Sequence, residues 1–442
     1  MSVMMNMQKD LATEQAAAGI PSLKEINSSY KFSDEEIKIL RELAKKVAEI
    51  ASSQEEERKA KLWTAHNDLK TTEPVVFVDP ENGWNEIILA STLQCSDTLA
   101  RVWEMQLKKL IYWAENMKDD KVIEKYFDVP YSFWDTGWGV ELQKHGGENN
   151  GAYKVKPAID EYEDDFEKVH YPEITIDWEE SEKVMDLAKY VFGDILEVRR
   201  KHTWWWTMGM TWEYINLRGL DNLMLDLMWE QEWVHKMMKL LSDGTMKRLD
   251  FLQENGLLAS NTEGTYVGSG GFGWTDQLKK PSEIVGNVTT QDMWGFCDSQ
   301  ETVGCSPETF AEFILPYQLP ILERFGLNCY GCCEPLNIRW DYVKRIPNLR
   351  RVSTSPWANK PVMAEYLGNK YIMSAKPSPS PLATPHMDED VVRRDIREIL
   401  DAAMPKGCVV EIIMKDNHTL GHNPRNITRW VEIAREEIAK TK

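Results

Sequence analysis

The chain has 442 residues, and its 52 Lys and Arg against 71 Asp and Glu give it a formal charge of −19. This excess of acid excludes a nucleic-acid binder that works by neutralising phosphates, because the field of the whole molecule would repel the ligand. Hydrophobic residues make up 42% of the sequence, which includes 18 tryptophans. That composition is typical of a globular protein with an aromatic interior.

The sequence has no run of about 18 apolar residues that would span a membrane, and its first ten residues lack the pattern of a secretion signal. We therefore expect a cytoplasmic protein without membrane contact. The seven cysteines are an odd number, and five of them lie within residues 297–333. In a reducing compartment this clustering favours free thiols, a metal site or catalysis over disulfides.

The first 62 residues are rich in Ala, Lys and Glu. Ser33-Asp34-Glu35-Glu36 has the residue types of a helix start, and apolar residues follow it at helical spacing from Ile37 to Ile50. We expect a helical N-terminal extension over residues 1–62 and one larger domain over residues 63–442.

Short β-like runs alternate with helical patterns through the rest of the chain. This alternation predicts parallel βα units, and eight of them predict an α/β fold closed into a (β/α)8 TIM barrel. A ninth run, residues 257–260, is interpreted as an insertion or a helix end. The eight runs are residues 75–79, 122–129, 202–208, 292–297, 328–333, 350–355, 371–375 and 408–414. Helical patterns cover residues 99–113, 220–241, 307–325, 362–367 and 390–402.

Two long segments, residues 136–182 and 262–276, interrupt the alternation. Long loops that follow barrel strands build the active-site face, so both are candidate walls or lids. The first contains Gly146-Gly147, Asn149-Asn150-Gly151 and an acidic run at residues 160–165 that is interpreted as solvated surface. The second is glycine-rich but lacks the Lys-Ser/Thr of a phosphate loop. We interpret it as a mobile loop that presents Tyr266, Phe272 and Trp274.

The clearest chemical feature is the segment Asn328-Cys329-Tyr330-Gly331-Cys332-Cys333-Glu334-Pro335. It reads as a strand that ends in two thiols, a carboxylate and a chain-stopping proline. A regular strand would point only one of Cys332 and Cys333 into the barrel, whereas zinc needs about four ligands. The loop after the last predicted strand offers His418 as a further donor. The plainer alternative is a pair of inert buried cysteines and a solvated histidine.

Several short motifs occur together over roughly residues 70–440. They are Thr207-Met208-Gly209, Leu217-Arg218-Gly219-Leu220, Phe296-Cys297-Asp298-Ser299-Gln300-Glu301, Ser306-Pro307-Glu308, Leu315-Pro316-Tyr317, Asn417-His418 and Asn423-Pro424-Arg425-Asn426-Ile427. In this combination the sequence resembles the uroporphyrinogen decarboxylase superfamily, and within it the corrinoid-dependent methyltransferases. The resemblance implies a (β/α)8 barrel with its active site at the C-terminal ends of the strands.

The resemblance also implies a zinc site with a His-x-Cys element on a middle strand and another ligand on the last strand. Here Tyr330-Gly331-Cys332-Cys333 stands at the first position, without the histidine, and His418 stands where a cysteine is usual. The expected metal ligands are therefore Cys332, Cys333 and His418, with Glu301 or Glu334 adding oxygen. Glu301 and Tyr330 are the candidate catalytic residues.

Aromatic and apolar side chains near the predicted strand ends suit a flat substrate. We expect a methoxylated aromatic compound whose ether oxygen meets zinc as a Lewis acid, while the resemblance implies that a corrinoid on a separate partner protein takes the methyl group. Candidate substrate-binding residues are Trp204, Trp206, Met208, Trp274 and Trp357.

Several alternatives remain at this stage. One is a methyltransferase that works in the reverse direction, from methylcorrinoid to a thiol. Another is a decarboxylase of the uroporphyrinogen type, which is disfavoured because residues 78–84 contain no arginine to hold porphyrin carboxylates. A non-catalytic binding barrel and a homodimeric assembly also stay open.

Overall fold

A computed structural model describes residues 28–70, 73–146 and 153–441. The predicted N-terminal helix is present as α2, Asp34–Ala51. Ser33 caps it in the expected way, because the Ser33 hydroxyl accepts from the Glu36 N–H while the Glu36 carboxylate accepts from the Ser33 N–H. Residues 1–27 of the predicted extension lie outside the described residues.

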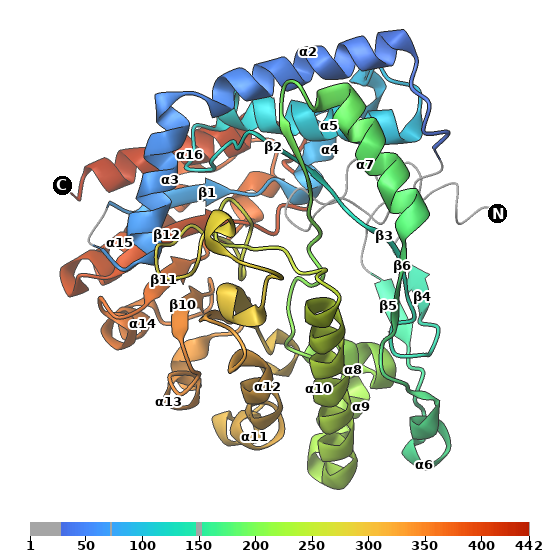
Figure 1. Ribbon diagram of the computed structural model, residues 1–442. Coiled ribbons are helices and arrows are strands. Elements are labelled where there is room, and N and C mark those ends of the chain that lie inside the picture. The colour runs from blue at the N-terminus through green and yellow to red at the C-terminus, as the bar shows by residue number, and fades with distance from the viewer. Residues whose placement is uncertain (1–27, 71–72, 147–152, 442) are drawn as a thin grey trace.

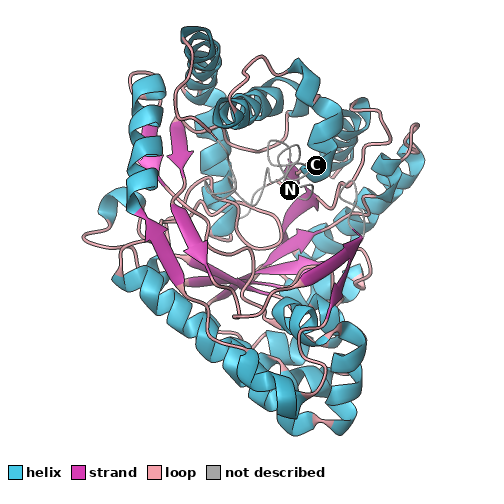
Figure 2. Ribbon diagram, turned by 90° about the vertical axis from the view of Figure 1, so that its right-hand side faces the viewer, coloured by secondary structure: helices cyan, strands magenta, loops and turns pink. Residues whose placement is uncertain are grey.

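The centre of the molecule is a six-stranded parallel sheet with the order β1-β12-β11-β10-β9-β8. Six of the eight predicted β-like runs are therefore confirmed as strands of one α/β sheet, although most boundaries shift by one or two residues. Helices surround the strands in both views (Figures 1 and 2). The strands are β1 Val75–Val78, β8 Trp294–Cys297, β9 Leu327–Tyr330, β10 Leu349–Thr354, β11 Ile372–Ala375 and β12 Val409–Met414.

A separate parallel pair consists of β2, Tyr126–Val129, and β7, Glu197–Arg200. The second predicted run contains β2, but the strand predicted at residues 202–208 is wrong, since that segment is an irregular loop. The actual strand reads Glu-Val-Arg-Arg and carries almost no hydrophobic signal. Its conformation depends on pairing with β2. Residues 257–260 form a loop after a helix rather than a strand.

Chain segments next to the β2–β7 pair contact both edges of the six-stranded sheet. On the β1 side, the Asp120 N–H donates to the Val76 carbonyl at 2.8 Å, and the Asp120 carboxylate accepts from the Val76 N–H. On the β8 side, the Met208 N–H donates to the Phe296 carbonyl at 3.0 Å. Each edge of the sheet therefore has at least one backbone group that is hydrogen-bonded to a neighbouring segment.

The helical patterns are present, but two of them are broken. The predicted helix at 220–241 is divided at Glu230, whose φ of −123° is not helical, and the one at 307–325 is divided at Ile314, just before Pro316. None of the helices in the described part of the chain is both long and apolar enough to cross a bilayer. The remaining helices are α3 Gln54–Asn67, α4 Trp84–Ile87, α5 Thr98–Tyr112, α6 Tyr162–Asp165, α7 Trp178–Phe192, α8 Thr211–Arg218, α9 Leu220–Trp229, α10 Gln231–Glu254, α11 Pro307–Phe313, α12 Leu315–Leu322, α13 Trp340–Val343, α14 Lys360–Leu367, α15 Glu389–Ala403 and α16 Arg425–Ala439.

The interruption at residues 136–182 contains one small antiparallel ribbon and one strand of a second. β3, Ser132–Asp135, pairs with β6, Ile174–Asp177, while β4, Gln143–Gly146, pairs with β5, Tyr153–Lys156. Gly147 and Asn149-Asn150-Gly151 lie outside the described residues. The acidic run includes the short helix α6.

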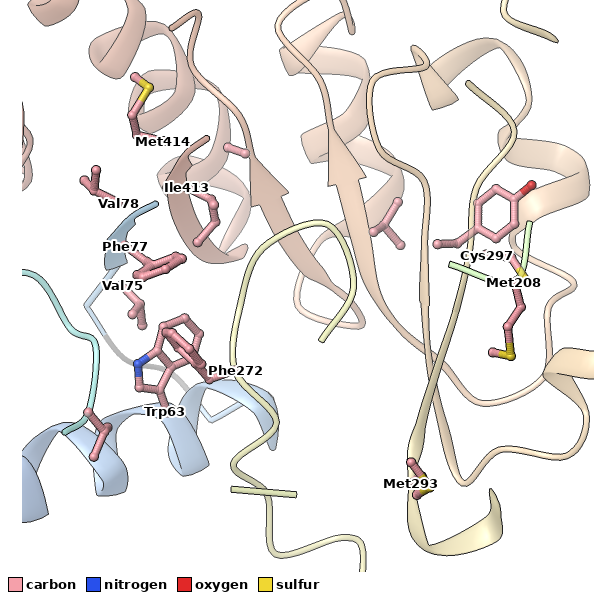
Figure 3. Close-up of a cluster of buried hydrophobic side chains, with 14 of the residues drawn as sticks. Trp63, Val75, Phe77, Val78, Met208, Phe272, Met293, Cys297, Ile413 and Met414 are labelled. Carbon is pink, nitrogen blue, oxygen red and sulfur yellow. The ribbon is translucent and has the colours of Figure 1, made fainter. Parts of the chain in front are cut away.

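The glycine-rich interruption at residues 262–276 is buried, which corrects its interpretation as a mobile loop. Phe272 is 2% exposed and packs edge-on against Trp63 and Phe77, as Figure 3 shows. The Asn67 amide donates to the Phe272 carbonyl at 2.7 Å. The glycines allow this segment to enter the core, because they let its backbone approach neighbouring strands more closely than other residues could.

Candidate functional site

Buried charged groups lie on one face of the sheet. Arg351 of β10 contacts the Glu411 carboxylate of β12 at 3.0 Å, and both side chains are at most 2% exposed. His66 of α3 and Ser374 of β11 also contact that carboxylate. Burial alone would raise the pKa of Glu411, but Arg351 and His66 outweigh it and lower the pKa to about 2. Arg351 and Glu411 therefore form a buried, charged ion pair on this face of the sheet.

A second polar cluster lies at the C-terminal ends of β9 and β12. The Cys332 sulfur has three hydrogen-bond donors around it. These are the Ser269 hydroxyl at 3.1 Å, the Lys415 ammonium at 3.3 Å and the Cys333 thiol at 3.6 Å. Cys332 and Lys415 are 2% and 6% exposed. The group, called here the Cys332 cluster, keeps the Cys332 sulfur and the Lys415 amino group away from bulk water.

The donors favour the thiolate form of Cys332. The Cys333 hydrogen bond, with Lys415 and Ser269, outweighs burial and lowers the pKa of Cys332 to about 7. The pKa of Cys333 is raised because its proton bonds Cys332. Burial opposes the Lys415 charge, yet the neighbouring Cys332 thiolate raises the pKa of Lys415 well above its ordinary value. The cluster therefore holds a thiolate–ammonium pair near neutral pH.

The turn after β9 explains why both thiols converge. Gly331 has a φ of +87°, so the strand ends at Tyr330 and its alternation of faces is broken. A Cβ on Gly331 would also lie 2.5 Å from Leu336. The Glu334 carboxylate then accepts from the N–H of Cys332 at 2.9 Å, which fixes the turn.

Ser269 reaches the Cys332 cluster from the glycine-rich segment. It is followed by Gly270 and Gly271, with φ values of +121° and +147°. An added Cβ would lie 2.4 Å from Ile413 at Gly270 and 2.8 Å from Arg351 at Gly271. Glycine is needed at both positions, because any side chain would push the segment away from the sheet and withdraw the Ser269 hydroxyl.

The expected zinc ligands come together only in part. The 3.6 Å between the sulfurs of Cys332 and Cys333 is close to the roughly 3.8 Å expected for two ligands of tetrahedral zinc at about 2.3 Å from the metal. However, His418 is exposed, and Glu301 accepts a hydrogen bond from Thr211 at 2.6 Å.

Glu334, the alternative oxygen ligand, is buried and engaged by the N–H groups of Ser299 and Cys332. Among the described residues, no group of three or more His, Cys, Asp or Glu side chains is placed to hold a metal ion. The Lys415 ammonium also lies beside Cys332, at 3.3 Å. This donor set does not fit the four-ligand zinc shell expected from the resemblance.

The expected substrate-binding residues divide into two groups. Trp206 is 40% exposed and lies over Lys415, with 5.8 Å from Nζ to the ring centroid, while Trp357 is 71% exposed. Trp204 and Met208 instead join the surrounding packing, since Trp204 stacks on Tyr131 and Met208 is buried. Trp206 is thus the expected aromatic residue that contacts the Cys332 cluster.

Tyr330 belongs to the interior, and Trp274 is partly buried against the core. The Trp274 carbonyl accepts from Asn67, whereas its indole N–H has no partner among the described groups. Tyr330 is fully buried and donates its hydroxyl proton to Gln318 at 2.8 Å. These contacts are those of packing residues, and none of them joins the Cys332 cluster.

Carboxyl groups beyond β8 hold their protons more tightly than usual. Burial raises the pKa of Glu213 to about 7 and raises that of Glu301, where the Thr211 hydrogen bond opposes it. Asp298, at the end of β8, has a strongly raised pKa for the same reason. One oxygen each of Asp298 and Glu213 has no partner among the described groups, so this region offers proton donors, of which Asp298 interacts electrostatically with Cys332.

Sequence reasoning missed three polar residues of this face, namely Ser269, Lys415 and Lys376. Lys376 follows β11, is 4% exposed, and has its pKa lowered to about 8 by burial. Both lysines come directly after apolar strands, and that position in the sequence was the available signal. Ser269 carried no comparable signal beyond the glycines around it. No protein-family model and no curated protein matches this chain.

Proposed function

We propose that the chain is a methyltransferase that demethylates a methoxylated aromatic compound and passes the methyl group to the corrinoid of a separate partner protein. The observation that carries the proposal is the Cys332 cluster, a buried thiolate–ammonium pair at the C-terminal ends of β9 and β12 with Trp206 over the ammonium. The resemblance of the sequence to corrinoid-dependent methyltransferases supports the same reaction class.

The proposal includes the architecture that the resemblance implies. In this architecture, the β2–β7 pair and the six-stranded sheet together form the eight strands of a (β/α)8 barrel. The backbone hydrogen bonds of Asp120 to β1 and of Met208 to β8 support this closure. The Cys332 cluster would then lie at the end of the barrel where such enzymes place their active sites.

Lys415 is the residue to which we assign the chemistry. Breaking the bond between the methyl carbon and the ether oxygen leaves the bonding electrons on that oxygen as a phenolate. The Lys415 ammonium, kept charged by Cys332, stabilises the developing negative charge in a site shielded from water. Trp206 supplies a flat surface for the ring. The reduced corrinoid supplies the electron pair that accepts the methyl group.

The test is release of a phenol from methoxylated benzoates in the presence of chemically reduced cobalamin. We expect release that depends on cobalamin, and a loss of about 100-fold or more in Lys415→Met, as for removal of one group that stabilises an oxyanion. Lys344→Met, which changes an exposed lysine directly after α13, is the matched control. Phenol release without cobalamin, or equal rates in the two variants, would contradict the proposal.

A further inference from the structure

The thiols of two consecutive residues lie beside each other just after β9. The sulfurs of Cys332 and Cys333 are 3.6 Å apart, and both cysteines are free. Neither residue belongs to a helix or a strand, so the alternation of a strand does not hold their side chains on opposite faces. A disulfide needs its sulfurs about 2.05 Å apart, so this pair would have to approach by about 1.5 Å. Small rotations of the two side chains are therefore the main change that a disulfide requires here.

Cys332 is the reactive member of the pair. The Ser269 hydroxyl at 3.1 Å and the Lys415 ammonium at 3.3 Å both donate to its sulfur. Such donors favour the thiolate, which is the form of cysteine that attacks oxidants. Burial instead raises the pKa of the five thiols outside the pair, which are Cys95, Cys297, Cys305, Cys329 and Cys408. An oxidant should therefore distinguish Cys332 from these five.

Cys333 is suited to react second. It is partly exposed, whereas Cys332 is 2% exposed, so the pair is not sealed from small solutes. In the reduced protein the proton of Cys333 bonds Cys332, and this bond raises the pKa of Cys333. Oxidation of Cys332 removes the thiolate that accepts this bond. The Lys415 charge, which lowers the pKa of Cys333, then favours the Cys333 thiolate.

We propose that Cys332 and Cys333 form a peroxide-sensitive site that closes a reversible disulfide. The Cys332 thiolate attacks one oxygen of hydrogen peroxide, which forms a sulfur–oxygen bond, breaks the oxygen–oxygen bond and releases hydroxide. This hydroxide takes the proton of Cys333 and becomes water. The Cys333 thiolate then attacks the Cys332 sulfur, which forms the sulfur–sulfur bond and displaces a second hydroxide. The two sulfurs together lose two electrons, and the peroxide gains them.

The spacing of the two residues makes such a disulfide easy to reduce. The peptide bond between them is trans, so their Cα atoms are about 3.8 Å apart, whereas most disulfides join Cα atoms about 4.4–6.8 Å apart. Strained disulfides are the labile ones that serve regulation or catalysis. Closing this one also removes the negative charge beside Lys415. The inference does not depend on the proposed function, because it concerns the chemistry of the thiols alone.

The test treats the reduced full-length chain with hydrogen peroxide at neutral pH, and then denatures it and alkylates the remaining thiols for mass spectrometry. Trypsin releases residues 325–339 as one peptide, which contains Cys329, Cys332 and Cys333. We expect a disulfide between Cys332 and Cys333 that forms several-fold faster than the partly exposed Cys305 is oxidised, and that dithiothreitol reverses. In Cys333→Ser, a sulfenic acid should accumulate at Cys332, where dimedone traps it.

Cys329→Ser is the matched control, because it removes the third thiol of the same peptide and should leave the disulfide unchanged. Three free thiols in the wild-type peptide at a peroxide dose that oxidises Cys305 would overturn the proposal. A disulfide that is lost in Cys329→Ser, or oxidation of Cys332 that dithiothreitol does not reverse, would overturn it as well. Absence of a dimedone adduct at Cys332 in Cys333→Ser would contradict the order of the two steps and overturn the mechanism.

Discussion

Replacing Lys415 by methionine should raise the pKa of Cys332. The Lys415 Nζ lies 3.3 Å from the Cys332 sulfur, and two unit charges at that distance attract by about 5 kcal/mol at an effective dielectric constant of about 20. Ser269 and Cys333 still donate in the variant, so the net loss is smaller. We expect the pKa of Cys332 to rise by at least 1, which corresponds to about 1.4 kcal/mol. From a starting pKa of about 7, the thiolate fraction at neutral pH would fall from about one half to about one tenth.

The thiolate can be followed by its ultraviolet absorbance as a function of pH. Subtracting the spectrum of the matching Cys332→Ser protein removes the contribution of the other cysteines. Lys344→Met controls for loss of an exposed lysine and should keep the wild-type midpoint. The same midpoint in Lys415→Met and wild type would refute the claim that Lys415 stabilises the thiolate.

Three further predictions concern stability. Gly270→Ala should lower the free energy of unfolding, measured by urea titration, by about 1–3 kcal/mol, because the added Cβ would lie 2.4 Å from Ile413. Gly304→Ala is the control. It should have little effect in the same titration, because its added Cβ would have no atom within 4 Å. Glu411→Gln should cost about 3–5 kcal/mol, because it leaves Arg351 buried without its partner, and an unchanged urea midpoint would contradict this. The low pKa of Glu411, about 2 in the folded chain, contributes stability that is present above about pH 4.5 and is lost as the pH falls toward 2. The stability difference between wild type and Glu411→Gln should therefore narrow on acidification, and a constant difference would count against the assigned ion pair.

Much of the fold could be predicted because its signals are local. The capping residues Ser33 and Glu36 lie three positions apart and locate the start of α2. Apolar runs revealed the six strands of the central sheet, since strands covered on both faces need hydrophobic residues along their length. β7, Glu197–Arg200, was missed because its residues are mostly charged and its strand conformation comes from pairing with β2, about 70 residues earlier in the chain.

The candidate site was only partly visible in the sequence. Cys332 and Cys333 stood out by their position after an apolar strand, and their convergence followed only from the turn at Gly331. Ser269 and Lys415 lie 63 and 83 residues from Cys332 along the chain, and neither belongs to a motif that would join them. The sequence by itself determined the six strands of the central sheet, most of the helices, and that thiols follow one of those strands. Only the tertiary structure decided which charge stands beside the Cys332 sulfur, because contacts between distant strand ends depend on the order and register of the whole sheet.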